Sequence, residues 1–236
     1  MTTSQTDGLL LVDKPAGVTS HDIVVAARRA LGERRIGHAG TLDPFATGLL
    51  VLLVGRATRL LPYMDGEPKT YVATVRFGAE TTTDDLEGEP VRAAPLPERA
   101  AVERGMAALT GEIAQVPPAF SAKKVEGRRA YHAARRGEAV ALAPVTVRVH
   151  EWRVLAWREA EVDVSITCGG GTYVRALARD LGRLAGSAAH LTRLRRVRSG
   201  SFAVDEAVSL EALRAGGAFL RPARDAVRSL PAEALD

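Results

Sequence analysis

Six consecutive apolar residues at positions 49–54, LLVLLV, constrain the fold of this chain more than any other feature. The run is too short to form a helix of its own, and Gly55 follows it directly. A continuous apolar run of this length between turn residues is typical of a strand buried on both faces. The sequence therefore predicts a central strand, and a loop that carries a single carboxylate, Asp43, leads into it.

The amino-terminal part predicts a second buried strand and a helix. Residues 8–14, GLLLVDK, form an apolar run that ends in a turn at Lys14. A helix is expected over residues 20–31, with Ser20 as its N-cap and Gly32 as its stop, because these residue types satisfy helix ends.

Later segments include both the alternating pattern of strands and the spacing of amphipathic helices. Residues 69–78, 145–155 and 161–168 alternate between apolar and polar side chains, which predicts half-buried strands. Residues 97–110 look helical, and a second helix is expected after the glycines at 169–171, with its apolar face made of Val174, Leu177, Ala178, Leu181 and Leu184. Strands and helices do not alternate strictly, so the predicted fold class is α+β rather than a doubly wound parallel sheet.

The sequence lacks the patterns of membrane, secreted, zinc-binding and phosphate-loop proteins. No apolar run is long enough for a membrane span and the amino end lacks the pattern of a signal peptide, so we expect a cytoplasmic protein. The single cysteine, Cys168, is predicted to be a buried packing residue. The five histidines show no paired spacing for zinc, and the glycines of GGGTYVR lack the flanking residues of a phosphate loop. We expect neither a metal nor a cofactor.

Charge is distributed unevenly along the chain. Residues 120–200 contain 16 Lys or Arg against 7 Asp or Glu, although the whole chain has a net charge of only +4. Six of these cations lie between Lys123 and Arg136, in a segment that reads as a basic insertion. A solvated surface and a contact surface for nucleic acid or another polyanion are both compatible with this asymmetry.

Six motifs occur in a fixed order between about Gly8 and Gly200: GLLLVDKPAGVTSHD, GHAGTLDPFATGLL, KTYVATVRFG, PPAFSAKKVEGRRAYHAAR, GTYVRALARDLG and HLTRLRRVRSG. In sequence and spacing this series resembles the TruB-type tRNA pseudouridine synthases. The resemblance implies one catalytic domain over residues 1–236 with a mixed, mainly antiparallel sheet and a thumb-like basic insertion at about 117–143. Family members usually carry a C-terminal PUA domain. Only 36 residues follow Gly200, so we expect that module to be absent.

The resemblance also assigns roles to residues. It implies Asp43 as the essential carboxylate, either as nucleophile or as the base that takes a sugar proton. Arg175 would be the cation that keeps this carboxylate ionised, and Tyr71 would stack on the target ring. The substrate-binding residues implied or proposed are His38, Leu191, Tyr173, Lys14, Lys123, Lys124, Arg128 and Arg129.

The expected reaction is the conversion of uridine-55 in the T arm of tRNA to pseudouridine after base flipping. It involves no redox change, which agrees with the missing cofactor motifs. The expected protein is a monomer without membrane contacts. Two alternatives stay open: a non-catalytic tRNA-binding or tRNA-folding module, and a guide-RNA-dependent enzyme of the dyskerin type.

Overall fold

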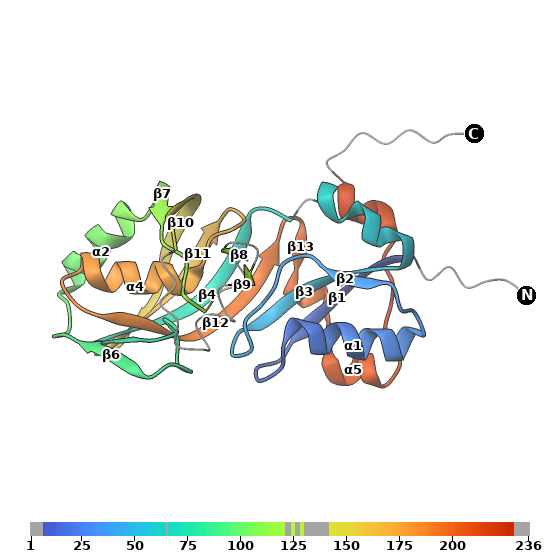
Figure 1. Ribbon diagram of the computed structural model, residues 1–236, viewed down its shortest axis with the longest axis horizontal. Helices are drawn as coiled ribbons and strands as arrows, with labels where there is room; N and C mark the ends of the chain where they lie inside the picture. The colour runs from blue at the N-terminus through green and yellow to red at the C-terminus, as the bar shows by residue number, and fades with distance from the viewer. Residues whose placement is uncertain (1–6, 65, 121–123, 126–127, 130–141, 229–236) are drawn as a thin grey trace, which may run out of the picture. The chain divides into compact units, whose positions relative to one another are not determined.

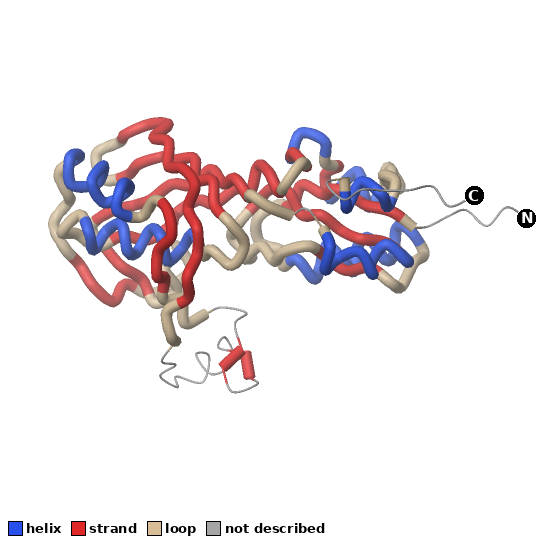
Figure 2. The backbone as a smooth tube through the Cα atoms, turned by 90° about the horizontal axis from the view of Figure 1, so that it is seen from above, coloured by secondary structure: helices blue, strands red, loops and turns tan. Residues whose placement is uncertain are grey.

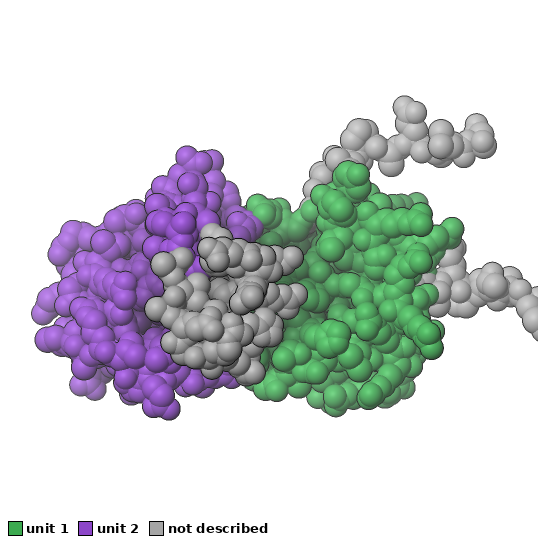
Figure 3. All heavy atoms as spheres, in the orientation of Figure 1, with its two compact units in different colours: residues 1–69, 195–236 green, residues 70–194 purple. Residues whose placement is uncertain are grey.

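The computed structural model describes residues 7–64, 66–120, 124–125, 128–129 and 142–228. The chain divides into two compact units, the first made of residues 1–69 and 195–236 and the second of residues 70–194 (Figure 3). Each unit combines strands with helices, which confirms the α+β class. The prediction of a single catalytic domain with a thumb-like insertion at about 117–143 stays a prediction.

The first unit is built on a sheet with the strand order β14-β1-β3-β12, to which β2 and β13 add at β3 and β12 (Figure 1). The pairs β1–β3, β2–β3 and β12–β13 are antiparallel, whereas β1–β14 and β3–β12 are parallel. The sheet is therefore mixed and mainly antiparallel, as predicted. Its strands are β1 (Gly8–Lys14), β2 (Ile36–His38), β3 (Thr47–Val54), β12 (Ala189–Ser199), β13 (Phe202–Ala203) and β14 (Val208–Ser209).

Strand β3 is buried on both faces, which confirms the prediction from LLVLLV. Its even-numbered residues pack in one core cluster with helices α1 (Ser20–Leu31) and α5 (Leu210–Arg214). Its odd-numbered residues pack in a second cluster with the 3-10 helices η1 (Gly55–Tyr63), η2 (Val204–Glu206) and η3 (Ala223–Val227). Because successive strand residues point to opposite faces, one short run serves both cores and anchors the loop before it.

Helix α1 runs over the predicted residues and ends at Gly32, which adopts the left-handed conformation at φ 63°. The predicted cap was wrong by one residue. Thr19 is the N-cap and forms a reciprocal capping box with Asp22. Thr19 therefore leaves the hydroxyl of Ser20 available for a different contact.

The second unit has the strand order β12-β4-β11-β10-β7. The predicted strands are confirmed, and Cys168 is buried at the end of β11. Two small hairpins lie outside this sheet, formed by β5 with β6 and by β8 with β9. The bounds are β4 (Lys69–Phe77), β5 (Ala79–Thr81), β6 (Pro90–Ala93), β7 (Gly111–Gln115), β8 (Lys124–Val125), β9 (Arg128–Arg129), β10 (Val145–Trp157) and β11 (Glu161–Cys168).

Two helices of the second unit, α2 (Arg99–Ala108) and α4 (Val174–Leu184), pack against each other (Figure 2). Gly105 of α2 lies against Leu181 of α4. The expected apolar face of α4 is confirmed except at Leu184, whose exposed fraction is 55%. Two arginines of α4, Arg175 and Arg179, are buried instead. Periodicity alone treats both as surface cations, and their burial directs attention to what they contact.

Candidate functional site

The candidate reacting carboxylate, Asp43, lies in the first unit, in the loop between β2 and β3. Asp43 is half-buried, and its carbonyl accepts a hydrogen bond from Ala46 at 3.1 Å, which closes a turn around Pro44. Leu42 before it and Phe45 after it are buried in the unit. The loop is thus fixed on both sides of the carboxylate by packing.

Hydrogen bonds hold the same loop from helix α1 and strand β1. The Ser20 hydroxyl donates to the carbonyl of Leu42 at 3.1 Å and accepts from its amide at 2.9 Å. The ammonium group of Lys14 donates to the carbonyl of Pro44 at 3.2 Å, and the amide of Gly17 donates to the same carbonyl at 2.9 Å. Both backbone neighbours of Asp43 therefore have fixed positions.

Lys14 is fully buried, so its charge needs compensation inside the protein. Besides Pro44, its ammonium group donates to the carbonyls of Pro15 at 2.9 Å and Val18 at 2.7 Å. Lys14 was predicted as a substrate-binding residue. In this structure it braces the loop of Asp43 through backbone carbonyls, and its substrate-binding role stays a prediction.

A third support comes from strand β12. The buried guanidinium of Arg196 donates to the carbonyl of Gly40 at 3.1 Å and to that of Leu49 at 2.8 Å. His38 lies at the start of the same loop, and burial lowers the pKa of its imidazole, with further lowering by the positive charges of Arg196 and His21. A neutral ring fits the proposed role of His38 beside an extruded base, because a neutral ring costs less to cover than a charged one.

The other candidate residues lie in the second unit. Tyr71 is buried on β4 and Leu191 is fully buried on β12. Tyr173 is the N-cap of α4, and its backbone amide and carbonyl both bind the side chain of Gln115, at 2.9 and 3.2 Å. This contact fixes where α4 begins and therefore where Arg175 lies.

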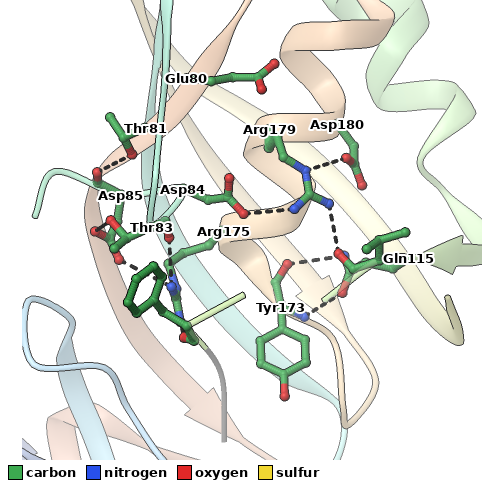
Figure 4. Close-up of polar contacts among 12 residues, drawn as sticks. Glu80, Thr81, Thr83, Asp84, Asp85, Gln115, Tyr173, Arg175, Arg179 and Asp180 are labelled. Atoms are coloured by element: carbon green, nitrogen blue, oxygen red, sulfur yellow. Dashed lines mark hydrogen bonds and ion pairs between the residues drawn. The ribbon is translucent and has the colours of Figure 1, made fainter. Parts of the chain in front are cut away.

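The guanidinium of Arg175 is held by two backbone carbonyls, of Thr83 at 2.8 Å and of Phe120 at 2.9 Å, and lies 3.5 Å from the carboxylate of Asp85 (Figure 4). Thr83 and Asp85 belong to residues 82–88, which we call the acidic turn. The amide of Leu191 donates to the carbonyl of Asp84 in the same turn at 3.1 Å. The turn therefore joins two of the predicted residues, Arg175 and Leu191.

Sequence reasoning missed Asp84, Asp85, Ser20 and Arg196. No role was predicted for the first two of these residues or for the segment that contains them. The signal was the pair of adjacent aspartates, since two buried carboxylates require buried cations, and α4 supplies them. Of the predicted basic residues, Lys123 lies outside the described residues, and Lys124, Arg128 and Arg129 lie in the hairpin of β8 and β9.

Within the described part of the chain, no helix has the length and apolar character to cross a membrane. The same residues include no cluster of three or more His, Cys, Asp or Glu side chains placed to hold a metal ion.

Comparison with known families gives the deciding observation. The model described as "TruB family pseudouridylate synthase (N terminal domain)" matches residues 28–174, and the model described as "tRNA pseudouridylate synthase B C-terminal domain" matches residues 175–230. The chain belongs to the TruB family of pseudouridylate synthases. The family resemblance seen in the six sequence motifs is thereby confirmed.

Curated TruB relatives are similar over most of the chain. The tRNA pseudouridine synthase B of Thermobifida fusca is 52% identical over 219 residues, which are 89% of this chain and 75% of that protein. The tRNA pseudouridine synthase B of Leifsonia xyli is 51% identical over 232 residues, which are 94% of this chain and 76% of that protein.

A solved structure shows the same fold. A chain in the crystal structure of a Cbf5-Nop10-Gar1 complex is 28% identical, with a TM-score of 0.71 over 95% of this chain. The match spans 62% of that longer chain.

Proposed function

We propose that this TruB-family chain converts uridine-55 in the T arm of tRNA to pseudouridine. The reaction breaks the bond between ribose C1′ and uracil N1, joins C1′ to C5 of the rotated ring, and releases the C5 proton to solvent. N1, freed from the sugar, takes up a proton from solvent, so substrate and product are isomers. The identity of 51–52% to enzymes named tRNA pseudouridine synthase B supports direct action on tRNA over the guide-RNA-dependent alternative.

The observation that carries the proposal is the fixed loop of Asp43. Ser20 holds the residue before Asp43, and Lys14 and Gly17 hold the residue after it. A carboxylate that attacks a sugar carbon or takes a sugar proton reacts faster when it is already in the reactive position before the substrate binds. The fixed loop would hold the Asp43 carboxylate in advance in this way, whether it acts as nucleophile or as base.

Further roles rest on the family resemblance. Tyr71 is proposed to stack on the target ring, Arg175 to keep the carboxylate ionised, and His38, Tyr173 and Leu191 to contact the extruded nucleotide. Extrusion costs on the order of a few kcal/mol, which contacts with the flipped base must offset. Lys123, Lys124, Arg128 and Arg129 are proposed to contact tRNA phosphates, and the active form is proposed to be a monomer.

The test is incubation of the purified chain with unmodified tRNA carrying tritium at uridine C5, without any added guide RNA. We expect tritium release and a single pseudouridine at position 55 by chemical mapping. A tRNA with cytidine at position 55 serves as the matched control and should give neither signal. Tight binding without release supports the non-catalytic module, and release only after addition of a guide RNA supports the dyskerin-type alternative.

A further inference from the structure

Helix α4 presents two buried arginines one turn apart, Arg175 and Arg179, with exposed fractions of 4% and 8% (Figure 4). Both guanidinium groups bridge the same two segments. One segment is the acidic turn, and the other is residues 116–120, which follow β7. An arginine can donate in several directions from one rigid plane, so each of these two side chains ties both segments to the helix.

The contacts of the two arginines run in parallel. Arg175 donates to the carbonyls of Thr83 and Phe120 at 2.8 and 2.9 Å. Arg179 donates to the carboxylate of Asp84 at 2.9 Å and to the carbonyl of Val116 at 2.8 Å. The groups that orient Arg175 therefore belong to the same two segments that Arg179 holds.

Asp84 is the residue through which this connection acts. It is 7% exposed and adopts a left-handed backbone conformation, φ 59°, which is uncommon for a residue with a Cβ and must be held by its surroundings. Its carboxylate contacts Arg179 and its carbonyl accepts from Leu191. The backbone around Asp84 aims the carbonyl of Thr83, directly before it, at Arg175.

We propose that Arg179 and Asp84 form a positioning pair that fixes the guanidinium of Arg175 for the isomerisation. The inference rests on the proposed function, because it assigns the pair to that reaction. Without the pair, the acidic turn and residues 116–120 each lose one of their ties to α4. The acceptors of Arg175 then shift, and small displacements of this kind reduce rates without removing any reacting group.

The same helix offers a matched control. Arg183, one turn beyond Arg179, binds the buried carboxylate of Glu80 at 2.7 and 3.0 Å. Glu80 lies on β5, outside the acidic turn. Loss of this pair also removes an arginine–carboxylate contact of α4, but it leaves the ties of Asp84 and Val116 intact.

The experiment uses the full chain and compares Arg179→Met, Asp84→Asn and Arg183→Met. Single-turnover tritium release from tRNA gives the rate, filter binding at one salt concentration gives Kd, and urea unfolding shows that each variant is folded. We expect Arg179→Met and Asp84→Asn to lower the rate about tenfold or more, about 1.4 kcal/mol at the transition state, while Kd changes less than about twofold. Arg183→Met should keep the rate within about twofold of the parent.

A double-variant cycle separates positioning from a general loss of structure. If Arg179 acts through Arg175, then Arg179→Met should add little to the defect of Arg175→Met, because the group that it positions is already gone. Additive effects contradict the inference, as does an Arg179→Met rate equal to that of the parent or of Arg183→Met. If Arg179→Met does not fold, Asp84→Asn, which keeps size and shape, decides on the same criteria. A parent chain without tritium release contradicts the proposed function instead.

Discussion

At the scale of single residues, Ser20 and Lys14 hold the two chain neighbours of Asp43 and thereby restrict the position of its carboxylate. Ser20 binds both backbone groups of Leu42, and Lys14 binds the carbonyl of Pro44. These bonds are made by residues distant in sequence from the loop, so they persist only when the unit is folded. The folded chain therefore bears the entropy cost of ordering the loop before any substrate arrives.

Asp43→Asn should abolish turnover and leave tRNA binding nearly unchanged. The amide keeps the shape of the side chain but cannot attack a sugar carbon or accept a proton as a carboxylate does. Tritium release and filter binding on one preparation measure both properties, and Glu103→Gln, an exposed change on α2, serves as control. Turnover within about tenfold of the parent rules out an essential role for Asp43.

Ser20→Ala should lower the turnover rate more than Thr19→Ala does. The first change leaves the amide and carbonyl of Leu42 without their partner, at a cost of about 1–3 kcal/mol, and loosens the loop of Asp43. The second removes the N-cap of the same helix, at a cost of about 0.5–2 kcal/mol, and does not touch the loop. Urea unfolding and single-turnover rates together distinguish the two effects, and equal rates contradict a role for Ser20 in the loop.

The pH dependence of stability tests the surroundings of Asp84. Burial raises the pKa of its carboxyl to about 6 from 3.8, and the attraction of Arg179 and Arg175 only partly offsets this effect. The folded state thus binds a proton more tightly than the unfolded state. The contribution of Asp84 to the free energy of unfolding is present below pH 3.8 and is lost as pH rises through 6.

Asp84→Asn should remove this contribution. The free energy of unfolding of the parent, minus that of the variant, should fall as pH rises from 4 to 7, by an amount on the order of 3 kcal/mol for a full shift of this size. Urea unfolding of both proteins at several pH values in this window measures the difference. A difference that does not change with pH contradicts the raised pKa.

At the scale of elements, sequence periodicity was sufficient to predict those strands whose position depends only on burial of apolar side chains. The run LLVLLV and the alternating segments predicted their strands because apolar burial alone determines them. Strand β12 was not predicted, since HLTRLRRVRS carries four arginines and only a few apolar residues. Arg196 is buried there because backbone carbonyls of the unit accept its hydrogen bonds, and such tertiary partners leave no local pattern in the sequence.

The same limit explains the errors on helices. Ser20 and Thr19 are both good caps, and the contact of Ser20 with Leu42, 22 positions away, decides between them. Leu184 fits the apolar face of α4 by spacing but lies near the end of the helix, where the core no longer covers it. The order of the six motifs was enough to single out the residues that were assigned roles by resemblance. Asp84 and Arg179 could be singled out only from their contacts in the folded structure.

The pairing of β3 with β12 predicts a strict need for glycine at position 48. Gly48 has φ 101°, and a Cβ at this position would lie 2.3 Å from the carbonyl oxygen of Arg196. Gly48→Ala should therefore destabilise the chain more than Gly216→Ala, where φ is 84° and nothing lies within 4 Å of the added atom. The control carries only the backbone strain, about 1–2 kcal/mol. Equal unfolding free energies for the two variants contradict this close approach.

At the scale of the whole molecule, the candidate residues are divided between the two units. Lys14, His38 and Asp43 belong to the first, and Tyr71, Tyr173, Arg175 and Leu191 to the second. Two strands, β4 and β12, contain the boundaries between the units, at residues 69–70 and 194–195. The chain thus passes between the units within strands that also carry proposed site residues, Tyr71 and Leu191.

The net charge is only +4, and six of the cations lie between Lys123 and Arg136, so we expect the proposed phosphate contacts to be local. Replacing Lys123, Lys124, Arg128 and Arg129 together by alanine should weaken binding and reduce its salt dependence. Each phosphate contact contributes about 0.7–0.9 to the slope of log K against log salt, so a full loss of four contacts should lower the slope by about 3.

A second quadruple alanine variant separates local contacts from total charge. Arg29, Arg34, Arg104 and Arg214 are exposed cations outside the basic insertion, and their replacement removes the same charge. Filter binding over a series of salt concentrations should show a flatter slope only for the insertion variant. Equal slopes in both variants and the parent mean that the insertion is a solvated surface. An equal reduction in both variants means that total charge, rather than the insertion, determines how this chain holds RNA.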